Sequence, residues 1–143
     1  MAQIPPIGEE ELLALRALLR DAGLPDDVGD HRETLLAVAR DGDRVIGGVA
    51  VEVHGGDGLL RSLVVDPASR SSGLGTGLVA AAAAAAGAHD LSGLYLLTET
   101  AASFFERLGY SRIVRTEVPA RVQESSEFAL LCPDTAVAMV RVL

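Results

Sequence analysis

A glycine-spaced loop, RSSGLGTG at residues 70–77, has the residue types and spacing best suited to binding chemistry in this sequence. It follows an apolar run that ends at Pro67 and leads into an alanine-rich tract. Glycine lets the backbone turn so that several N–H groups point outward, and the start of the next helix carries a partial positive charge. The loop therefore suits a pyrophosphate, but any strand-to-helix turn can use glycine, so the rest of the chain must identify the ligand.

Two familiar phosphate-binding motifs do not fit. A P-loop requires a lysine, and all twelve basic residues of this chain are arginine. The dinucleotide fingerprint requires a long doubly wound sheet, which the remainder of a 143-residue chain scarcely supplies. Nucleotide hydrolysis and hydride transfer are both disfavoured.

Apolar periodicity predicts the elements that precede the loop. Leucines at helical spacing behind three glutamates predict a helix over 8–23, followed by an acidic, turn-rich loop. Two β-rich runs, 34–40 and 45–53, are joined by the hairpin signal DGD. The turn HGGDG leads into a third strand over 59–65, so three strands should form an antiparallel meander.

The elements after the loop predict a crossover. Alanines within 75–88 favour a helix of little bulk that can lie close against a sheet. Because this helix intervenes, a strand over 94–98 should run parallel to 59–65. A short helix over AASFFERLGY should end at Gly109 as its C′ glycine. Two closing strands are expected at 110–115 and 135–143, with a partly helical excursion over 119–132.

Together these elements predict an α/β (α+β) fold. The length allows a single domain over residues 1–143 with one core, a mixed central sheet of about six strands and flanking helices.

Composition narrows the class of protein. A formal charge of −8 argues against nucleic acid as a partner and mildly favours cationic substrates. No apolar run reaches the length of a membrane span, and the start MAQIPPIGEEE lacks the features of a secretory signal, so we expect a cytoplasmic protein with no membrane partner. The single cysteine, Cys132, can build neither an internal disulfide nor a thiolate metal site, and we expect no metal.

Two stretches carry a family resemblance. VVDPASRSSGLGTGL resembles the strand, proline and R-x-x-G-x-G acetyl-CoA loop of the GNAT family of N-acetyltransferases, and LYLLTETAASFFERLGYSR resembles its next strand, short helix and G-[FY] ending. More narrowly, LLRSLVVDP and the tail EFALLCPDTAVAM resemble the arsenic-resistance (ArsN-like) branch. The resemblance implies a GNAT-like fold, acetyl-CoA as co-substrate and transfer of an acetyl group to an amine.

The resemblance also implies where acetyl-CoA lies. The loop amides would hold the pyrophosphate through Arg70, Ser71, Ser72, Gly73, Leu74, Gly75 and Thr76. Arg70 would pair with a phosphate or cap local carbonyls. The thioester would lie between two splayed strands along Leu63, Val64 and Val65, where the N–H of Val65 or Leu63 polarises the acetyl carbonyl. Phe104 and Phe105 would pack on the pantetheine or belong to the core.

The attacking amine must lose a proton, because an alkyl ammonium is mostly protonated at neutral pH. Many family members carry a glutamate where this chain has Leu59. We therefore expect the base to be Glu99, His54 or Glu52, in that order. Glu52 and His54 share one face of a strand, and Glu99 directly follows another, although each also fits a solvated surface position.

Two further features of the site follow from the resemblance. Family members often use a tyrosine to protonate the leaving thiolate, but Phe105 occupies that position and cannot donate a proton. Arg61 and Ser62 are polar within an apolar strand beside the expected gap. Arg61 would hold a substrate carboxylate or arsonate-like oxyanion, or would lie on the solvent side of the pleat.

Three functions remain open from the sequence. The first is an acetyl-CoA-dependent N-acetyltransferase for a small amine, including organoarsenicals and amino-acid analogues, with direct attack in a ternary complex. The second is an acetyl-CoA-binding sensor with little turnover, and the third is a protein N-acetyltransferase. An exposed edge strand also favours a homodimer.

Overall fold

The computed structural model describes residues 8–31, 33–70, 73–125 and 135–143. The described helices are α1 (Glu9–Asp21), α2 (Leu74–Ala88), α3 (Ala102–Arg107) and α4 (Ala120–Gln123), with 3-10 turns η1 (Pro67–Ser69) and η2 (Arg115–Glu117). The described strands are β1 (Thr34–Asp41), β2 (Arg44–His54), β3 (Asp57–Val65), β4 (Gly93–Thr98), β5 (Ser111–Ile113) and β6 (Val137–Val142). Among these helices, none combines the length and apolar character that crossing a membrane requires.

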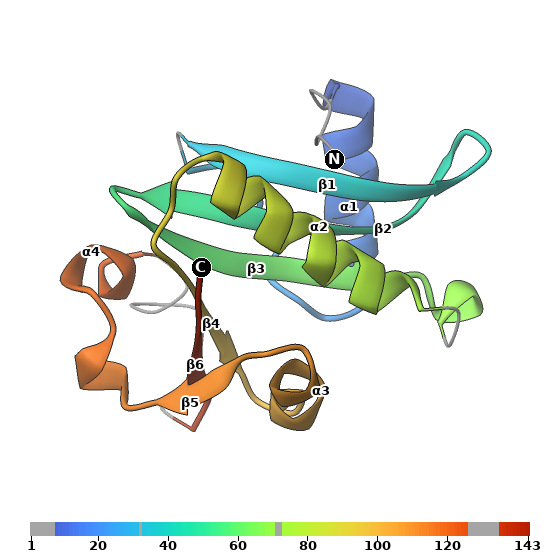
Figure 1. Cartoon of the computed structure of the whole chain (residues 1–143). Helices are drawn as coiled ribbons and strands as arrows, with labels where there is room; N and C mark the ends of the chain where they lie inside the picture. The colour runs from blue at the N-terminus through green and yellow to red at the C-terminus, as the bar shows by residue number, and fades with distance from the viewer. Residues whose placement is uncertain (1–7, 32, 71–72, 126–134) are drawn as a thin grey trace.

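The strands form one mixed six-stranded sheet in the order β1-β2-β3-β4-β6-β5, which confirms the predicted fold (Figure 1). The first three strands are the expected antiparallel meander, and β4 runs parallel to β3. The last strand, β6, pairs antiparallel with both β4 and β5. The strand expected over 110–115 is shorter than predicted, because the chain turns into η2 at Arg115.

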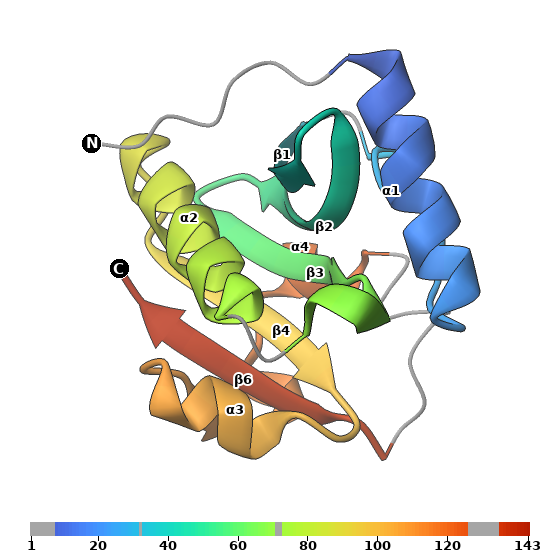
Figure 2. The ribbon, with the colours of Figure 1, turned by 90° about the vertical axis from the view of Figure 1, so that its right-hand side faces the viewer.

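Helices cover both faces of the sheet, with α2 and α1 on opposite sides of β2 and β3 (Figure 2). Two neighbouring glycines of β2 make room for them. A Cβ on Gly47 would lie 3.2 Å from a methyl group of Leu78 in α2, and one on Gly48 would lie 2.6 Å from a methyl group of Leu15 in α1. The Gly-Gly pair therefore lets both layers approach the sheet closely.

The alanine-rich helix α2 packs on the sheet through small side chains, as its composition predicted. Ala82 and Ala86 are fully buried in the main core cluster, between the larger residues Leu78 and Leu91. Because these alanines add so little bulk, α2 holds its N-terminus close to the end of β3. That end of α2 belongs to the candidate site.

A bulge in β3 opens the sheet beside β4. Gly48 pairs with Val64 and Ala50 pairs with Arg61, so Ser62 and Leu63 together face the single β2 residue Val49. Ser62 has a positive φ of 59°, which a non-glycine residue adopts at such an irregularity. From Leu60 onward, which includes the bulge, β3 no longer pairs with β4, since their parallel ladder covers only Asp57–Leu59 of β3. The predicted splay between these strands is thus present in the structure.

The loop between α1 and β1 is held in place by contacts with α1. Arg16 donates to the Val28 carbonyl oxygen from Nε at 3.1 Å and Nη2 at 3.0 Å, and it pairs with Asp30 at 2.9 Å. Val28 itself is fully buried against α1. These contacts hold a loop that lines each of the cavities described below.

Helix α3 ends as the sequence predicted. Gly109 has a φ of 95°, its N–H bonds the Glu106 carbonyl at 3.2 Å, and the Tyr110 N–H bonds the Phe105 carbonyl at 3.1 Å. These two bonds form a Schellman motif, with glycine at C′. The motif directs the Tyr110 ring into the core, edge-on to Phe105 at 5.5 Å between ring centroids.

Tyr110 provides a test of this packing. Its hydroxyl is buried without a hydrogen-bond partner among the described residues, and burial raises its pKa from 10.0 to about 12 despite the opposing charge of Arg141. Because the pKa of Tyr110 is higher in the folded than in the unfolded chain, its contribution to the free energy of unfolding is fully present below pH 10, the unfolded-state pKa. This contribution is lost as the pH rises from 10 toward the folded-state pKa of about 12. Between pH 9 and pH 11 the wild type should lose about 1 kcal/mol of unfolding free energy more than Tyr110→Phe, as measured by urea denaturation. Equal losses in the two proteins would contradict the burial of this hydroxyl.

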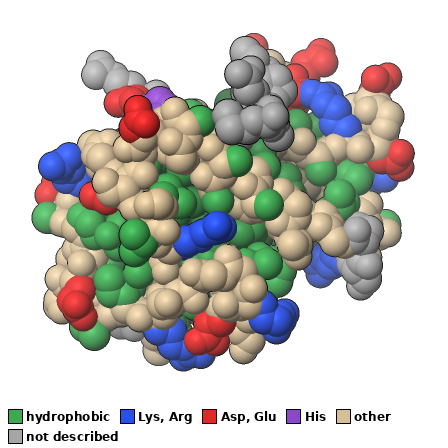
Figure 3. Space-filling view, in the orientation of Figure 1, with side chains coloured by type: hydrophobic (Ala, Val, Ile, Leu, Met, Phe, Trp, Pro, Cys, Tyr) green, Lys and Arg blue, Asp and Glu red, His purple; other side chains and the backbone are tan. Residues whose placement is uncertain are grey.

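Charge is distributed unevenly over the surface. On the face shown in Figure 3, arginine and acidic side chains are interspersed and lie mainly toward the margins. Several acidic residues gather instead around one cavity, which is lined by Asp27, Asp30, Glu33, Glu52 and Glu124.

Candidate active site

The first cavity, of about 490 Å³, lies where the glycine loop meets β3 and α2. It is lined by Ala22, Leu24, Leu63, Val64, Val65, Ser69, Arg70, Gly73, Leu74, Gly75, Thr76 and Phe104. All of the expected acetyl-CoA-binding residues except Ser71, Ser72 and Phe105 are in this wall. Ser71 and Ser72 lie outside the described residues. The structure thus brings the bulge of β3 and the start of α2 to one opening.

Backbone conformation explains glycine at one of two positions in this wall, while neither conformation nor packing requires it at the other. Gly73, the N-cap of α2, has a φ of 82°, a conformation that favours glycine. Gly75 is helical, and a Cβ there would meet only Phe104, at an ordinary 3.7 Å. Glycine inside a helix costs about 1 kcal/mol relative to alanine, so protein packing does not account for Gly75.

The first N–H groups of α2, at Leu74, Gly75 and Thr76, line this cavity at the positive end of a fifteen-residue helix. Such groups have no carbonyl partner within their own helix. They are therefore arranged to donate to an anion such as a pyrophosphate. The Arg70 side chain instead donates locally, from Nε to the Val65 carbonyl oxygen at 3.3 Å.

The amide of Val65 points into the splay. The Asp66 N–H bonds the Ile46 carbonyl of β2 at 2.7 Å. Since consecutive residues of an extended strand direct their amides to opposite sides, Val65 turns its N–H away from β2. The contact of the Val65 carbonyl with Arg70, outside the sheet, agrees with this direction.

A second cavity, of about 630 Å³, occupies the splay itself. It is lined by Gly23, Leu24, Pro25, Leu60, Arg61, Ser62, Leu63, Leu96, Leu97, Thr98, Glu99, Thr100, Ala101, Phe105 and Ala136. Leu24 and Leu63 line both this cavity and the first, so the two adjoin. A ligand held at the start of α2 could extend between the separated strands.

Glu99 follows β4 directly and is exposed in the wall of this second cavity. Neighbouring polar groups come from Ser62, Thr98 and Thr100. The two phenylalanines divide between the cavities. Phe104 is half-buried in the wall of the first, while Phe105 is buried and lines the second.

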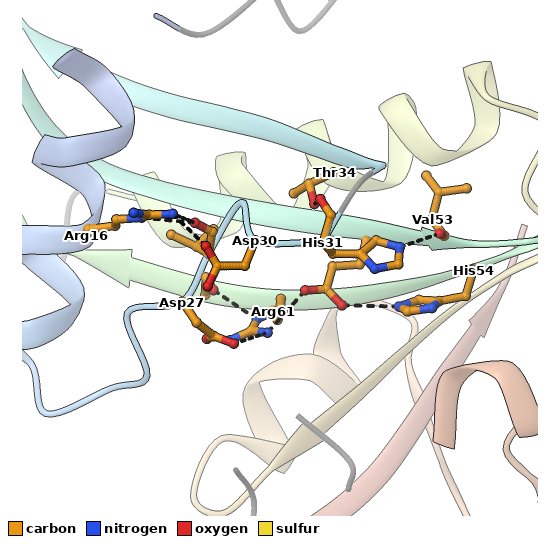
Figure 4. A network of polar contacts seen from close by, with 11 residues as sticks. Arg16, Asp27, Asp30, His31, Thr34, Val53, His54 and Arg61 are labelled. Carbon is orange, nitrogen blue, oxygen red and sulfur yellow. Dashed lines mark hydrogen bonds and ion pairs between the residues drawn. The ribbon is translucent and has the colours of Figure 1, made fainter. Parts of the chain in front are cut away.

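Arg61 also lines the second cavity and is almost wholly buried, with 1% of its side chain exposed. It does not lie on the solvent side of the pleat. Its guanidinium forms an ion pair with Asp27, and Nη1 lies 3.1 Å from Oε2 of Glu52, while Nε donates to the Ser62 hydroxyl at 3.2 Å (Figure 4). Two carboxylates of the chain thus already contact the group expected to bind a substrate oxyanion.

Behind Arg61 lies a third cavity, of about 700 Å³, which contains the other two base candidates. Glu52 is buried, and its Oε1 lies 3.1 Å from Nε2 of His54. The cavity also brings in His31, whose ring centroid is 4.2 Å from that of His54. Of the three candidates, Glu99 alone lines the cavity in the splay.

Sequence reasoning missed the loop residues of these sites. Leu24 lines two cavities, Asp27 pairs with Arg61, and His31 contacts His54. The acidic composition of the segment after the first helix was the available signal, but it did not indicate which residues turn inward.

The comparisons with known proteins agree with this geometry. Residues 32–112, more than half of the chain, match the family described as an acetyltransferase (GNAT) domain. The chain therefore belongs to the GNAT family, and this membership makes it an acyltransferase of the acetyl-CoA-dependent N-acetyltransferase class. No curated protein sequence matches the chain significantly.

Solved structures share the fold at low sequence identity. Rv2747 from Mycobacterium tuberculosis, solved with CoA, is 22% identical over 99% of each chain, with a TM-score of 0.75. PaiA N-acetyltransferase from Thermoplasma acidophilum, also in complex with coenzyme A, is 13% identical over 100% of each chain, with a TM-score of 0.72. N-acetylglutamate synthase from Neisseria gonorrhoeae, complexed with coenzyme A and N-acetyl-glutamate, is 20% identical over 99% of this chain but 34% of that chain, with a TM-score of 0.73. At these identities the likeness establishes the fold.

Proposed function

We propose that this protein transfers the acetyl group of acetyl-CoA to the amine of a small molecule, by direct attack within a ternary complex. The observation that carries the proposal is the pair of adjoining cavities. One of them is lined by the start of α2, and the other lies between the separated strands β3 and β4. This arrangement supports a pyrophosphate at the helix start, a thioester in the splay and an acceptor beside it. The reaction is expected in the cytoplasm.

Acetyl-CoA binding would depend mostly on the main chain. The amides of Leu74, Gly75 and Thr76 donate to the pyrophosphate, and Phe104 lies against the pantetheine. In the splay, the N–H of Val65 or Leu63 donates to the acetyl oxygen as it becomes negative during attack. Pre-oriented donors of this kind typically stabilise a transition state by about 3–4 kcal/mol.

The acceptor would enter the 630 Å³ cavity, whose size suits a small molecule. The neutral amine attacks the thioester carbon, a C–N bond forms, and collapse of the tetrahedral intermediate breaks the C–S bond to release CoA. Glu99 takes the proton that the amine loses. Since a thiolate is already a tolerable leaving group, the absence of a tyrosine at Phe105 need not prevent transfer.

Three features guide the choice of acceptors. The ArsN-like resemblance favours organoarsenicals and amino-acid analogues, and the Neisseria neighbour was solved with N-acetyl-glutamate. Arg61 would contact a substrate carboxylate from its position in the cavity wall, sharing its guanidinium with Asp27 and Glu52. A panel of acceptors should therefore include glutamate, phosphinothricin, arsinothricin and simple alkyl amines.

Initial-rate kinetics of thiol release test the proposal. With acetyl-CoA and an accepted amine both varied, a ternary complex gives intersecting double-reciprocal lines, whereas a covalent acetyl-enzyme gives parallel lines. Acetyl-CoA binding without amine-dependent release across the panel would instead favour the sensor function. Release only with peptides would favour a protein acetyltransferase.

The role of Glu99 has its own test. Glu99→Gln should lower kcat/KM for the amine by about 100-fold, because a positioned general base typically contributes 10²- to 10⁴-fold, while acetyl-CoA affinity stays unchanged. Glu106→Gln, on the exposed surface of α3, is the matched control and should retain full activity. A Glu99→Gln enzyme as active as this control would remove Glu99 from the mechanism.

A further inference from the structure

We propose that His31, Glu52 and His54 form a binding site for one divalent transition-metal ion, with Zn²⁺ as the ion that two imidazoles and one carboxylate favour. One ligand atom from each of the three side chains lies within 4.8 Å of the others. The site is separate from the acetyl-CoA cavities and does not depend on the proposed transfer reaction.

The spacing of the three side chains is close to that of a bound ion. Zinc binds histidine nitrogen and carboxylate oxygen at about 2.0–2.2 Å, which puts two ligands of a tetrahedral ion about 3.4 Å apart. Oε1 of Glu52 and Nε2 of His54 are already 3.1 Å apart. The third ligand atom, from His31, lies within 4.8 Å of both, so it has to approach them by at most about 1.4 Å to complete the set.

The hydrogen bond made by His31 leaves the correct atom for coordination. Its Nε2 lies 2.8 Å from the Val53 carbonyl oxygen, which can only accept, so Nε2 carries the hydrogen (Figure 4). In the neutral ring Nδ1 therefore has a lone pair. A metal-binding histidine commonly donates its other N–H to a backbone carbonyl in this way, because the bond fixes the tautomer and the ring orientation.

Glu52 is oriented in a comparable way. Arg61 contacts Oε2 at 3.1 Å, which leaves Oε1 directed at His54. An ion would take the place of the hydrogen that now lies between Oε1 and Nε2 of His54. The carboxylate keeps its bond to Arg61, so the buried charge of Glu52 remains compensated.

The surroundings of the three ligands favour a cation and allow one to enter. The site opens into the 700 Å³ cavity, which supplies space for a water as fourth ligand. With Glu52, the carboxylates of Asp27, Asp30, Glu33 and Glu124 in this cavity outnumber three guanidinium groups: Arg121 in the wall, Arg16 paired with Asp30, and Arg61 paired with Asp27 and Glu52. This excess of negative charge raises the local concentration of cations.

A bound ion would join two segments that are distant in sequence. His31 belongs to the loop before β1, and Glu52 and His54 belong to the end of β2. That loop also contributes Leu24 to both ligand cavities. Metal binding should therefore raise thermal stability as well as fix this loop.

Zinc titration of the full chain against a chromophoric chelator tests the site, with Cys132→Ser in every protein so that no thiol competes. We expect one Zn²⁺ per chain, and an affinity at least about 100-fold weaker in His31→Gln and in His54→Gln. The chain has three histidines, so His89→Gln is the matched control and should bind as the parent does. Equal affinity in the parent and a His31→Gln/His54→Gln double variant, or an equal loss in His89→Gln, would overturn the proposal.

A second measurement needs no ligand variant. In nitrogen-15 spectra of the imidazole groups, Zn²⁺ should shift the resonances of two histidines, with Nδ1 of His31 and Nε2 of His54 moving most, and leave His89 unchanged. A spectrum in which His89 alone responds, or in which none does at saturating Zn²⁺, would rule the site out.

Discussion

Replacing Gly75 by glutamate is expected to abolish acetyl-CoA binding while leaving the fold intact. The new side chain would project from the first turn of α2 into the 490 Å³ cavity, where an added Cβ meets only Phe104 at 3.7 Å. Its carboxylate would lie where the pyrophosphate binds. Two unit charges about 4 Å apart repel by about 4 kcal/mol at an effective dielectric constant of ~20, which corresponds to a loss of about 1,000-fold in affinity.

The control for this variant is Gly87→Glu, the same change near the other end of α2. Gly87 is exposed, and a Cβ there would meet nothing within 4 Å. Calorimetric titration with acetyl-CoA should give parental affinity for Gly87→Glu and no measurable binding for Gly75→Glu. Gly73 is a poorer position for this test, because its φ of 82° strains any other residue. Parental affinity in a folded Gly75→Glu protein would show that the pyrophosphate binds elsewhere.

Arg61→Met is expected to lower the free energy of unfolding by about 3–5 kcal/mol. Removing one member of a buried ion pair leaves the other charge less compensated, and here both Glu52 and Asp27 would lose their ion pair with Arg61. Urea denaturation should show the loss as a lower midpoint with an unchanged slope. The size of the effect follows from burial, since 1% of the Arg61 side chain is exposed.

Two variants make the Arg61 result specific. Arg20→Met removes an arginine that pairs with Asp26 at 3.0 Å, where the two side chains are 59% and 47% exposed, and it should cost less than about 1 kcal/mol. Adding Glu52→Gln to Arg61→Met should restore part of the stability, because the buried carboxylate becomes neutral. If the double variant is no more stable than Arg61→Met, the loss does not come from an uncompensated Glu52 charge.

The sequence predicted the parts of this structure that depend on local patterns. The hairpin at DGD, the alanine-rich helix α2 and the C′ glycine Gly109 are each predicted from residues close together in the chain, and each is present in the structure. The parallel pairing of β3 with β4 followed from the helix between them, through the preferred geometry of crossovers.

Contacts between distant segments could not be predicted in this way. Period-two spacing put Glu52 and His54 on one face, but nothing local brought His31 or Asp27 to them. The same spacing left Arg61 free to face solvent or cavity, and its burial follows from two carboxylates contributed by separate elements. The expectation of no metal rested on the single cysteine, and the cluster of His31, Glu52 and His54 carries no sequence motif, because its two histidines are 23 positions apart. Cys132 lies outside the described residues.

The most direct test of the central proposal follows the acetyl carbon itself. Acetyl-CoA labelled with carbon-13 at the carbonyl is incubated with the protein and each amine of the panel, and the products are observed by NMR. Acetyl transfer predicts that the label appears in an amide of one acceptor, with one CoA released per amide formed, and that Gly75→Glu forms none. Label that stays in acetyl-CoA, or that appears only as acetate with every amine, would contradict the assignment of this protein as a small-molecule N-acetyltransferase.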